Sequence, residues 1–205
     1  MLAATNLECV RGSRSLFSGI SFTLHTGRLL QIDGVNGSGK TSLLRMVCGL
    51  LQPARGEILW HGQITRKLRE QYHADVAYLG HANGVKDELS ALENLRVSTR
   101  LAGEKVSDED AYKALWRLGL EWREHLPAKV LSQGQKRRVA LARLLLTRKP
   151  LWLLDEPVAS VDAAAVSVLE SMLETHLTQG GMVMLTTHQE VRTPPAATQR
   201  IRLGT

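Results

Sequence analysis

Gly34-Val35-Asn36-Gly37-Ser38-Gly39-Lys40-Thr41 is the stretch that decides the fold of this chain of 205 residues. It fits the pattern G-x-x-x-x-G-K-[ST], it follows the apolar run at 29–32, and apolar residues at helical spacing come after it. A strand, a glycine-rich loop and a helix in this order hold a phosphate, because the loop turns its N–H groups inward and the helix points its positive end at the anion. The stretch therefore predicts an α/β nucleotide-binding fold.

The side chains of this loop have predicted tasks at a bound ATP. Lys40 supplies a positive charge to the β- and γ-phosphates, and Thr41 offers its hydroxyl as a ligand to Mg²⁺. Ser42 follows in the first helical turn. The alternative is a glycine-rich turn that merely precedes a lysine, and the strand before it and the helix after it argue against this. The residues expected to contact ATP here are Gly34, Asn36, Gly37, Ser38, Gly39, Lys40, Thr41 and Ser42.

A second predicted element of the nucleotide site is the apolar run at 151–154, which ends in Asp155 and Glu156. The pattern is typical of a buried strand with two carboxylates at its end. Asp155 is expected to hold Mg²⁺ through water, and Glu156 to orient or deprotonate the attacking water, because phosphoryl transfer depends on positioning and charge neutralisation. Taken alone, a strand that ends in two carboxylates is a common solvated strand end, and its meaning here comes from the phosphate loop upstream.

The composition favours one α/β domain in a reducing compartment. The chain is 43% hydrophobic, 22% charged and 4% aromatic, which is enough to bury a substantial core. Cys9 and Cys48 lack metal-ligand or disulfide spacing, so reduced thiols are expected, with Cys48 in helix packing. We find no signal peptide and no apolar run of about 18 residues. The net charge of +6 suits an anionic partner but is dispersed along the chain.

The remaining pattern divides the chain into strand-like and helix-like parts. Residues 1–33 alternate in polarity like strands, and further strands are expected at 57–60 and 76–79. Between about 90 and 147 the pattern is helical, with a capping box at Ser90 and Glu93 and further helices from Asp108 and from Ser132 or Gly134. Strands are expected again from 151, 182 and 200, with a helix from about 162 to 177.

Leu131-Ser132-Gln133-Gly134-Gln135 resembles the LSGGQ signature of the ABC transporter ATPase family, with Gln133 in place of the first glycine. The other motifs stand in that family's order, since residues 160–162 resemble its D-loop and 186–188 its switch-histidine segment. The resemblance implies an ABC cassette of the P-loop NTPase class, with a RecA-like core, an N-terminal antiparallel β subdomain and an α-helical subdomain at about 82–147. Residues 1–205 then form one ATPase domain, and His188 contacts the γ-phosphate.

The signature predicts a homodimer of cassettes. Ser132 and the N–H groups at Gly134 lie at an expected helix N-terminus, which is an anion site, but the phosphate loop of the same chain already surrounds its own nucleotide. The family resolves this across a two-fold interface, so Ser132, Gly134 and Gln135 are expected at the ATP of the partner. ATP binding then closes the pair and hydrolysis opens it. Ser132 is also expected to be an ordinary helix N-cap.

Two positions depart from the family pattern. The family usually has a glutamine after the strand that joins the core to the helical subdomain, where it touches Mg²⁺ and the membrane partner, and here His81 takes that place. The position makes His81 a candidate residue of the metal site, where histidine can hydrogen-bond water although it binds Mg²⁺ poorly. The aromatic residue that stacks on adenine matches Arg11, whose guanidinium plane could stack instead. Phe17 is the competing candidate, although its surroundings favour core packing.

Four segments narrow the resemblance to the haem-exporter ATPases of bacterial c-type cytochrome biogenesis. These segments are residues 16–22, 80–81, 89–95 and 186–189. The resemblance implies ATP hydrolysis coupled to transport, membrane-spanning partners of the CcmB and CcmC type, and a peripheral position on the cytoplasmic side of the inner membrane. No residue indicates a direct haem site, and Trp116 and Trp122 are the better candidates for a partner interface.

Two other functions remain open. A cassette of another transport system, for a lipoprotein or a small solute, is the main alternative, because the membrane partner chooses the cargo. A nucleic-acid-associated ABC ATPase is disfavoured, because the chain lacks the coiled coil, the zinc module or the second cassette typical of those proteins. Direct binding of nucleic acid is not expected.

Overall fold

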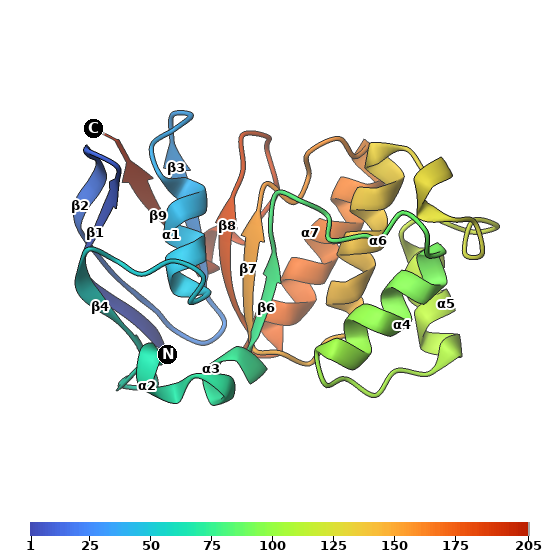
Figure 1. Cartoon of the computed structure of the whole chain (residues 1–205), viewed down its shortest axis with the longest axis horizontal. Coiled ribbons are helices and arrows are strands. Elements are labelled where there is room, and N and C mark those ends of the chain that lie inside the picture. The colour runs from blue at the N-terminus through green and yellow to red at the C-terminus, as the bar shows by residue number, and fades with distance from the viewer. Residues whose placement is uncertain (205) are drawn as a thin grey trace.

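The computed structural model describes residues 1–204, which form two sheets with helices between and beside them (Figure 1). The first sheet is antiparallel, in the order β2-β1-β4-β5. Its strands are β1 (Leu2–Arg11), β2 (Arg14–Leu24), β4 (Arg55–Trp60) and β5 (Gln63–Ile64). Two short helices, α2 (Thr65–Leu68) and α3 (Glu70–Ala74), lead from it to the second sheet. This part is the predicted N-terminal antiparallel subdomain.

The second sheet is parallel and carries the nucleotide motifs at the carboxyl ends of its strands. Its order is β6-β7-β8-β3-β9. Its strands are β3 (Leu29–Gly34), β6 (Val76–Leu79), β7 (Leu151–Asp155), β8 (Met182–Thr186) and β9 (Thr198–Leu203). Because the strands are parallel, the ends of β3, β7 and β8 lie together, and they bring the phosphate loop, Asp155 and Thr186 to one place.

The central strands β7 and β8 of the parallel sheet are buried on both faces, which explains why they have continuous apolar sequences. On one face, Leu151, Leu153 and Met184 pack with helix α1 (Lys40–Val47) and the antiparallel sheet. In Figure 1 this helix lies between the two sheets. On the other face, Trp152 and Leu154 pack against α6 (Gln133–Leu145) and α7 (Ala163–Thr178). Helix α1, which follows the phosphate loop, is therefore anchored in the core between the two sheets.

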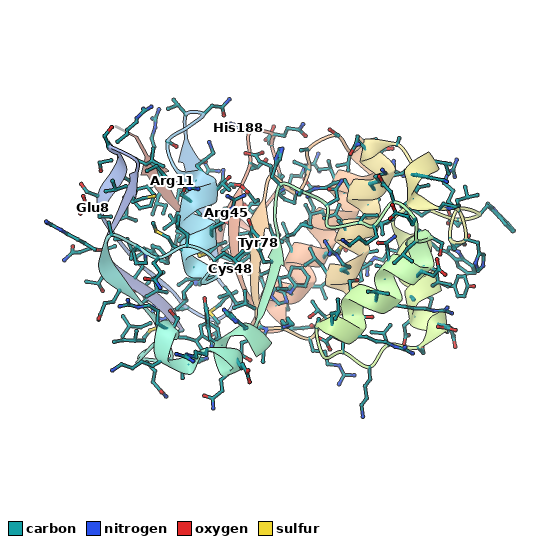
Figure 2. All side chains as sticks on the ribbon, viewed as in Figure 1. Glu8, Arg11, Arg45, Cys48, Tyr78 and His188 are labelled. Atoms are coloured by element: carbon teal, nitrogen blue, oxygen red, sulfur yellow. The ribbon has the colours of Figure 1, made fainter. Side chains whose placement is uncertain are left out.

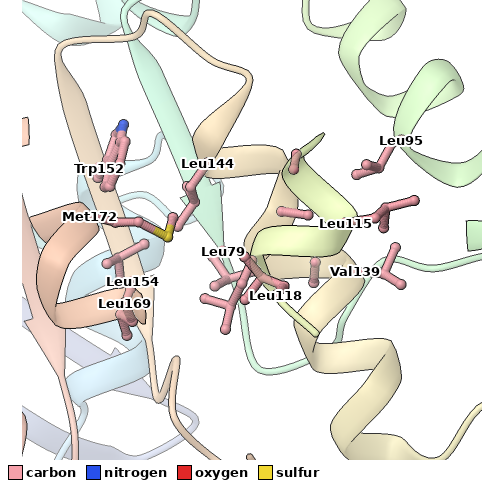
Figure 3. Close-up of a cluster of buried hydrophobic side chains, with 14 of the residues drawn as sticks. Leu79, Leu95, Leu115, Leu118, Val139, Leu144, Trp152, Leu154, Leu169 and Met172 are labelled. Atoms are coloured by element: carbon pink, nitrogen blue, oxygen red, sulfur yellow. The ribbon is translucent and has the colours of Figure 1, made fainter. Parts of the chain in front are cut away.

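The helical part lies beyond α7, on the side of the parallel sheet that faces away from the antiparallel sheet (Figure 1). It contains α4 (Ala91–Leu101), α5 (Asp108–Arg117) and α6, with a 3₁₀ turn at Ala128–Val130. Figure 3 shows its core, where Leu95 of α4, Leu115 of α5 and Val139 of α6 meet. Leu79, Leu144 and other residues of the same cluster continue this core to the sheet. The boundary of about 82–147 that the sequence predicts for this subdomain stays a prediction.

The sequence predictions of the elements are largely confirmed, with small shifts at their ends. The capping box at Ser90 and Glu93 is present, with the Glu93 N–H donating to Ser90 Oγ over 3.2 Å. Asp162 is the N-cap of α7, and β9 begins at residue 198. Cys9 and Cys48 are free thiols, and burial raises the pKa of Cys48 to about 11. Within residues 1–204, no helix has the length and apolarity to cross a bilayer.

Candidate nucleotide site

The phosphate loop lies between β3 and α1 and depends on glycine. Gly37 and Gly39 have φ angles of 81° and 102°, in the left-handed region that other residues rarely adopt. A Cβ atom on Gly39 would lie 2.8 Å from the Phe17 ring. Phe17 is 7% exposed and belongs to the core, so its core-packing interpretation is confirmed. The Phe17 ring therefore packs against the loop at Gly39.

Lys40 is folded onto the loop that it follows. Its Nζ donates to the carbonyl oxygens of Gly34 and Val35, over 2.8 and 3.2 Å. The side chain is only 8% exposed. A buried ammonium needs such acceptors, and two carbonyls of a phosphate loop hold it in place for an anion. Ser38 is buried beside it, and its Oγ atom has no hydrogen-bond partner among the described residues.

Asp155, at the end of β7, has a carboxylate that is half satisfied. Its Oδ1 atom accepts from Thr41 Oγ1 over 3.1 Å and from Thr186 Oγ1 over 2.8 Å. Its Oδ2 atom is buried and has no partner among residues 1–204. An unpartnered oxygen of a carboxylate that is 1% exposed, next to the Thr41 hydroxyl, fits a hard cation with oxygen ligands. These residues therefore fit Mg²⁺.

Glu156 is held in an unusual backbone conformation by the segment after β8. Its φ angle is 49°, which costs on the order of 1 kcal/mol for a residue with a side chain. The His188 N–H donates to Glu156 Oε2 over 3.1 Å, and His188 Nε2 lies 3.4 Å from Oε1. The Glu156 N–H donates to the Thr186 hydroxyl. The Glu156 carboxylate and the His188 ring are thus adjacent at one end of the sheet.

A cleft of about 350 Å³ brings most of the predicted residues together. Besides Leu16, it is lined by Asn36, Gly37, Gly39, Lys40, Thr41, Ser42, His81, Asp155, Glu156 and His188. Figure 2 shows His188 beyond the end of β8. Gly34 and Ser38 belong to the same loop but do not line the cleft. His81 also lines a neighbouring pocket of about 420 Å³ with Arg45 and Tyr78, so this side chain lies between two hollows.

The predicted signature residues lie apart from this cleft, at the start of α6. The Gln135 N–H donates to Ser132 Oγ, and Gln135 Oε1 accepts from the Ser132 N–H, so the two form a capping box. The N-cap prediction for Ser132 is confirmed. A Cβ atom on Gly134 would overlap the carbonyl oxygen of Ser160, so only glycine fits there. Ser132 is exposed and free to meet another chain.

Arg11 is another predicted residue that the cleft does not include. It is exposed at the end of β1, paired with Arg14 across the turn of the β1–β2 hairpin (Figure 2). The structure therefore leaves its predicted stacking on adenine as a prediction.

Sequence reasoning missed two residues of the site. Thr186 connects Asp155 to Glu156, and its hydroxyl at the end of the apolar strand β8 was the available signal. Arg137, inside the basic run 136–138, is 3% exposed and donates to the Asp155 and Glu156 carbonyls. A basic run of this kind on a helix is typical of a solvated face, but the charge of Arg137 is buried against the end of β7.

Comparison with known proteins decides the family. Residues 17–159 match the family described as ABC transporter. The chain belongs to the ABC transporter family. The prediction of this family, of its cassette fold and of ATP binding and hydrolysis is confirmed at that level.

Curated relatives of the chain match over its full length. It is 53% identical to the cytochrome c biogenesis ATP-binding export protein CcmA of Nitrosospira multiformis, over 98% of both chains. It is 52% identical to the protein of the same name in Dechloromonas aromatica, over 100% of both. The resemblance to the cytochrome c biogenesis ATPases is therefore confirmed.

Solved structures agree on the fold. An ATP-binding protein of an ABC transporter from Pyrococcus furiosus is 27% identical, with a TM-score of 0.84 over 98% of this chain and 96% of that one. A dimeric ATP-binding cassette in complex with ADP and phosphate is 22% identical, with a TM-score of 0.78 over 92% of this chain and 88% of that one. The second likeness shows the fold alone.

Proposed function

We propose that this chain is the ATP-hydrolysing subunit of a membrane export complex for c-type cytochrome biogenesis, the haem exporter. The observation that carries the proposal is the cleft at the ends of β3, β7 and β8, which gathers Lys40, Asp155, Glu156 and His188 in a chain that is more than half identical to CcmA proteins. The cleft accounts for the ATPase, and the relatives account for the process that it drives.

The phosphates bind to the loop at 34–41 and to the N-terminus of α1. Lys40 moves from the carbonyls of Gly34 and Val35 to the phosphate oxygens, which are stronger acceptors. Asn36, Gly37, Ser38 and Gly39 contribute backbone N–H groups, and Ser42 adds a hydroxyl in the first helical turn. This cradle fixes the γ-phosphate without any covalent step.

Thr41 and Asp155 would hold Mg²⁺, Thr41 through its hydroxyl and Asp155 through water, and the Asp155 Oδ2 atom has no other partner among the described residues. The ion, when bound, neutralises charge on the phosphate oxygens. His81 approaches the same space from the other side of the cleft. Since histidine is a poor Mg²⁺ ligand, we assign it to contact with water at the site.

Glu156 orients the attacking water and accepts its proton, and His188 binds the γ-phosphate. The two contacts between them fix the carboxylate before ATP arrives. Preorganisation of this kind lowers the barrier because little rearrangement remains for the reaction itself. Arg11 is proposed to stack on adenine from the β1–β2 hairpin.

Two chains form the working unit. Ser132, Gly134 and Gln135 of one chain complete the site of the other, because their own cleft does not include them. The pair docks on membrane-spanning subunits of the CcmB and CcmC type, on the cytoplasmic side of the inner membrane. Trp122, which is 92% exposed, and Trp116, which is 49% exposed, lie in the helical part and are proposed contacts. The cargo contacts those subunits.

The test is a pull-down with the Glu156→Gln variant and ATP from detergent-solubilised membranes of the source cell. This variant is expected to bind ATP without hydrolysis and so to hold the closed dimer on its partners. The Lys40→Ala variant is the matched control, since weakened ATP binding should leave the dimer open. Partners are identified by mass spectrometry, and the eluate is scanned for haem absorbance.

Recovery of a small multi-span subunit with a haem-bearing component, reduced in the Lys40→Ala control, supports the proposal. A different permease without haem would keep the ATPase and reject haem export. Nucleic acid in place of membrane subunits would reject the transporter function.

A further inference from the structure

Arg137 of α6 donates five hydrogen bonds, all to uncharged oxygen atoms of other segments. Nε donates to the Pro157 carbonyl over 3.1 Å, and Nη2 donates to the carbonyls of Asp155 and Glu156, each over 2.8 Å. Nη1 donates to the Gly80 carbonyl over 2.8 Å and to Asn83 Oδ1 over 3.3 Å. A guanidinium has five N–H donors, so every donor of Arg137 is used.

The Arg137 side chain is buried and has no carboxylate partner among the described ion pairs. Desolvation lowers the pKa of Arg137 to about 10, so the group keeps its charge at neutral pH. Burial of a cation costs desolvation energy that hydrogen bonds to uncharged oxygen atoms offset only in part, even when every donor is satisfied. Stability alone therefore does not explain an arginine at this position.

The three segments that Arg137 joins are the ones whose relative positions matter for hydrolysis. Residues 80–83 carry His81, residues 155–157 carry Glu156, and α6 follows its N-cap Ser132, which is proposed to contact the ATP of the partner chain. The carbonyls of Asp155, Glu156 and Pro157 converge on one guanidinium because Glu156 has a left-handed φ of 49°. Arg137 thereby stabilises the backbone turn that aims the Glu156 carboxylate at the cleft.

We infer that Arg137 is a positioning residue for Glu156, which it fixes relative to the His81 segment and the signature helix. A shift of residues 80–83 or of α6, of the kind that a docked partner imposes, then moves the Glu156 backbone through these bonds. Arg137 does not line the cleft, so we expect its effect on the hydrolysis step and not on ATP binding. The inference rests on the role proposed for Glu156.

The experiment compares Arg137→Lys and Arg137→Gln with the wild-type full chain. Lysine keeps the charge but has three donors from one atom, and glutamine keeps a planar amide without the charge, so neither reaches all three segments. We expect kcat for ATP hydrolysis to fall by about 10²-fold, the loss that follows when a reacting group moves by about an ångström. The KM for ATP and the Kd of a fluorescent ATP analogue are expected to stay within about twofold of wild type, because the phosphate loop is untouched.

Arg138→Lys is the matched control. Arg138 is the next residue of α6 and bonds to the Leu118 carbonyl and to Asp162, without contact to residues 155–157. The kcat of the Arg138→Lys variant is expected to stay close to that of the wild type.

A double mutant separates positioning from general damage. In the Glu156→Gln background the carboxylate is already lost, so Arg137→Lys should cause no further fall in the residual rate. If the two losses multiply, Arg137 does not act through Glu156 and the inference is wrong.

Other outcomes are equally decisive. Normal kcat in both Arg137 variants would contradict the inference, as would a Kd for the ATP analogue that rises in proportion to the lost rate. Loss of folding in both variants would show that Arg137 serves the fold alone. If Glu156→Gln by itself hydrolyses ATP normally, the proposed role of Glu156 fails, which is a result distinct from failure of the inference.

Discussion

The Thr186 hydroxyl offers a sharp test of how the carboxylates of the site are held. Thr186 is fully buried, donates to Asp155 Oδ1 over 2.8 Å and accepts from the Glu156 N–H over 3.1 Å. Replacing it by valine keeps the shape of the side chain and removes both bonds. Asp155 then keeps only Thr41 as a donor, while the Glu156 N–H keeps the Thr186 carbonyl at 3.1 Å.

The size of the effect follows from these contacts. A hydrogen bond to a carboxylate contributes about 1.5–3 kcal/mol, and the Glu156 bond is partly replaced, so the free energy of unfolding should fall by about 2 kcal/mol. For a chain of this size that lowers Tm by about 4–8 °C. If about 1.4 kcal/mol of this loss also raises the activation free energy of hydrolysis, kcat falls about tenfold.

The assays are thermal unfolding of the full chain and steady-state ATP hydrolysis with Mg²⁺. Thr187→Val is the control, because the Thr187 hydroxyl bonds only within its own turn, to Gln189. We expect the control to lose less kcat than Thr186→Val. Unchanged Tm and kcat in Thr186→Val would refute the reasoning that this hydroxyl positions Asp155 and Glu156.

Three further predictions concern the loop, the dimer and the core. Lys40→Ala should raise the Kd for ATP at least about tenfold in equilibrium titration, because the main charge facing the phosphates is lost; an unchanged Kd contradicts this. Ser132→Arg should fold normally yet fail to dimerise with ATP in light scattering, and a normal ATP-dependent dimer would reject the shared site. Burial lowers the pKa of His176 below its usual 6.5, so the unfolded chain takes up this proton first and stability falls as the pH drops below about 6.5. His176→Gln should weaken that dependence in denaturation curves, and an unchanged slope would exclude His176 as its source.

Much of the fold could be predicted from local signals. The phosphate loop, the capping box at Ser90, the N-cap at Ser132 and the apolar runs of β7 and β8 each have a short-range physical cause, and the structure has each of them where expected. The carboxyl ends of parallel strands lie on the same side of a sheet, so Lys40 and Asp155 could be placed together from the sequence alone.

The missed parts depend on contacts between distant segments. Arg137 lies in a run of three basic residues that has the pattern of a solvated face, and only packing against residues 155–157 shows that its charge is buried. Glu156 has a left-handed φ angle, which a glutamate in the sequence does not indicate. The distinction between Arg11 and Phe17 likewise depends on the tertiary contact of Phe17 with Gly39.

The most direct test of the central claim is the amount of covalently attached haem in the c-type cytochromes of the source cell after deletion of this gene, measured by haem staining of membrane proteins. We expect loss of the stained bands, recovery with the wild-type chain, and no recovery with Glu156→Gln produced at the same level. Normal bands in the deletion strain, or full recovery with Glu156→Gln, would contradict it.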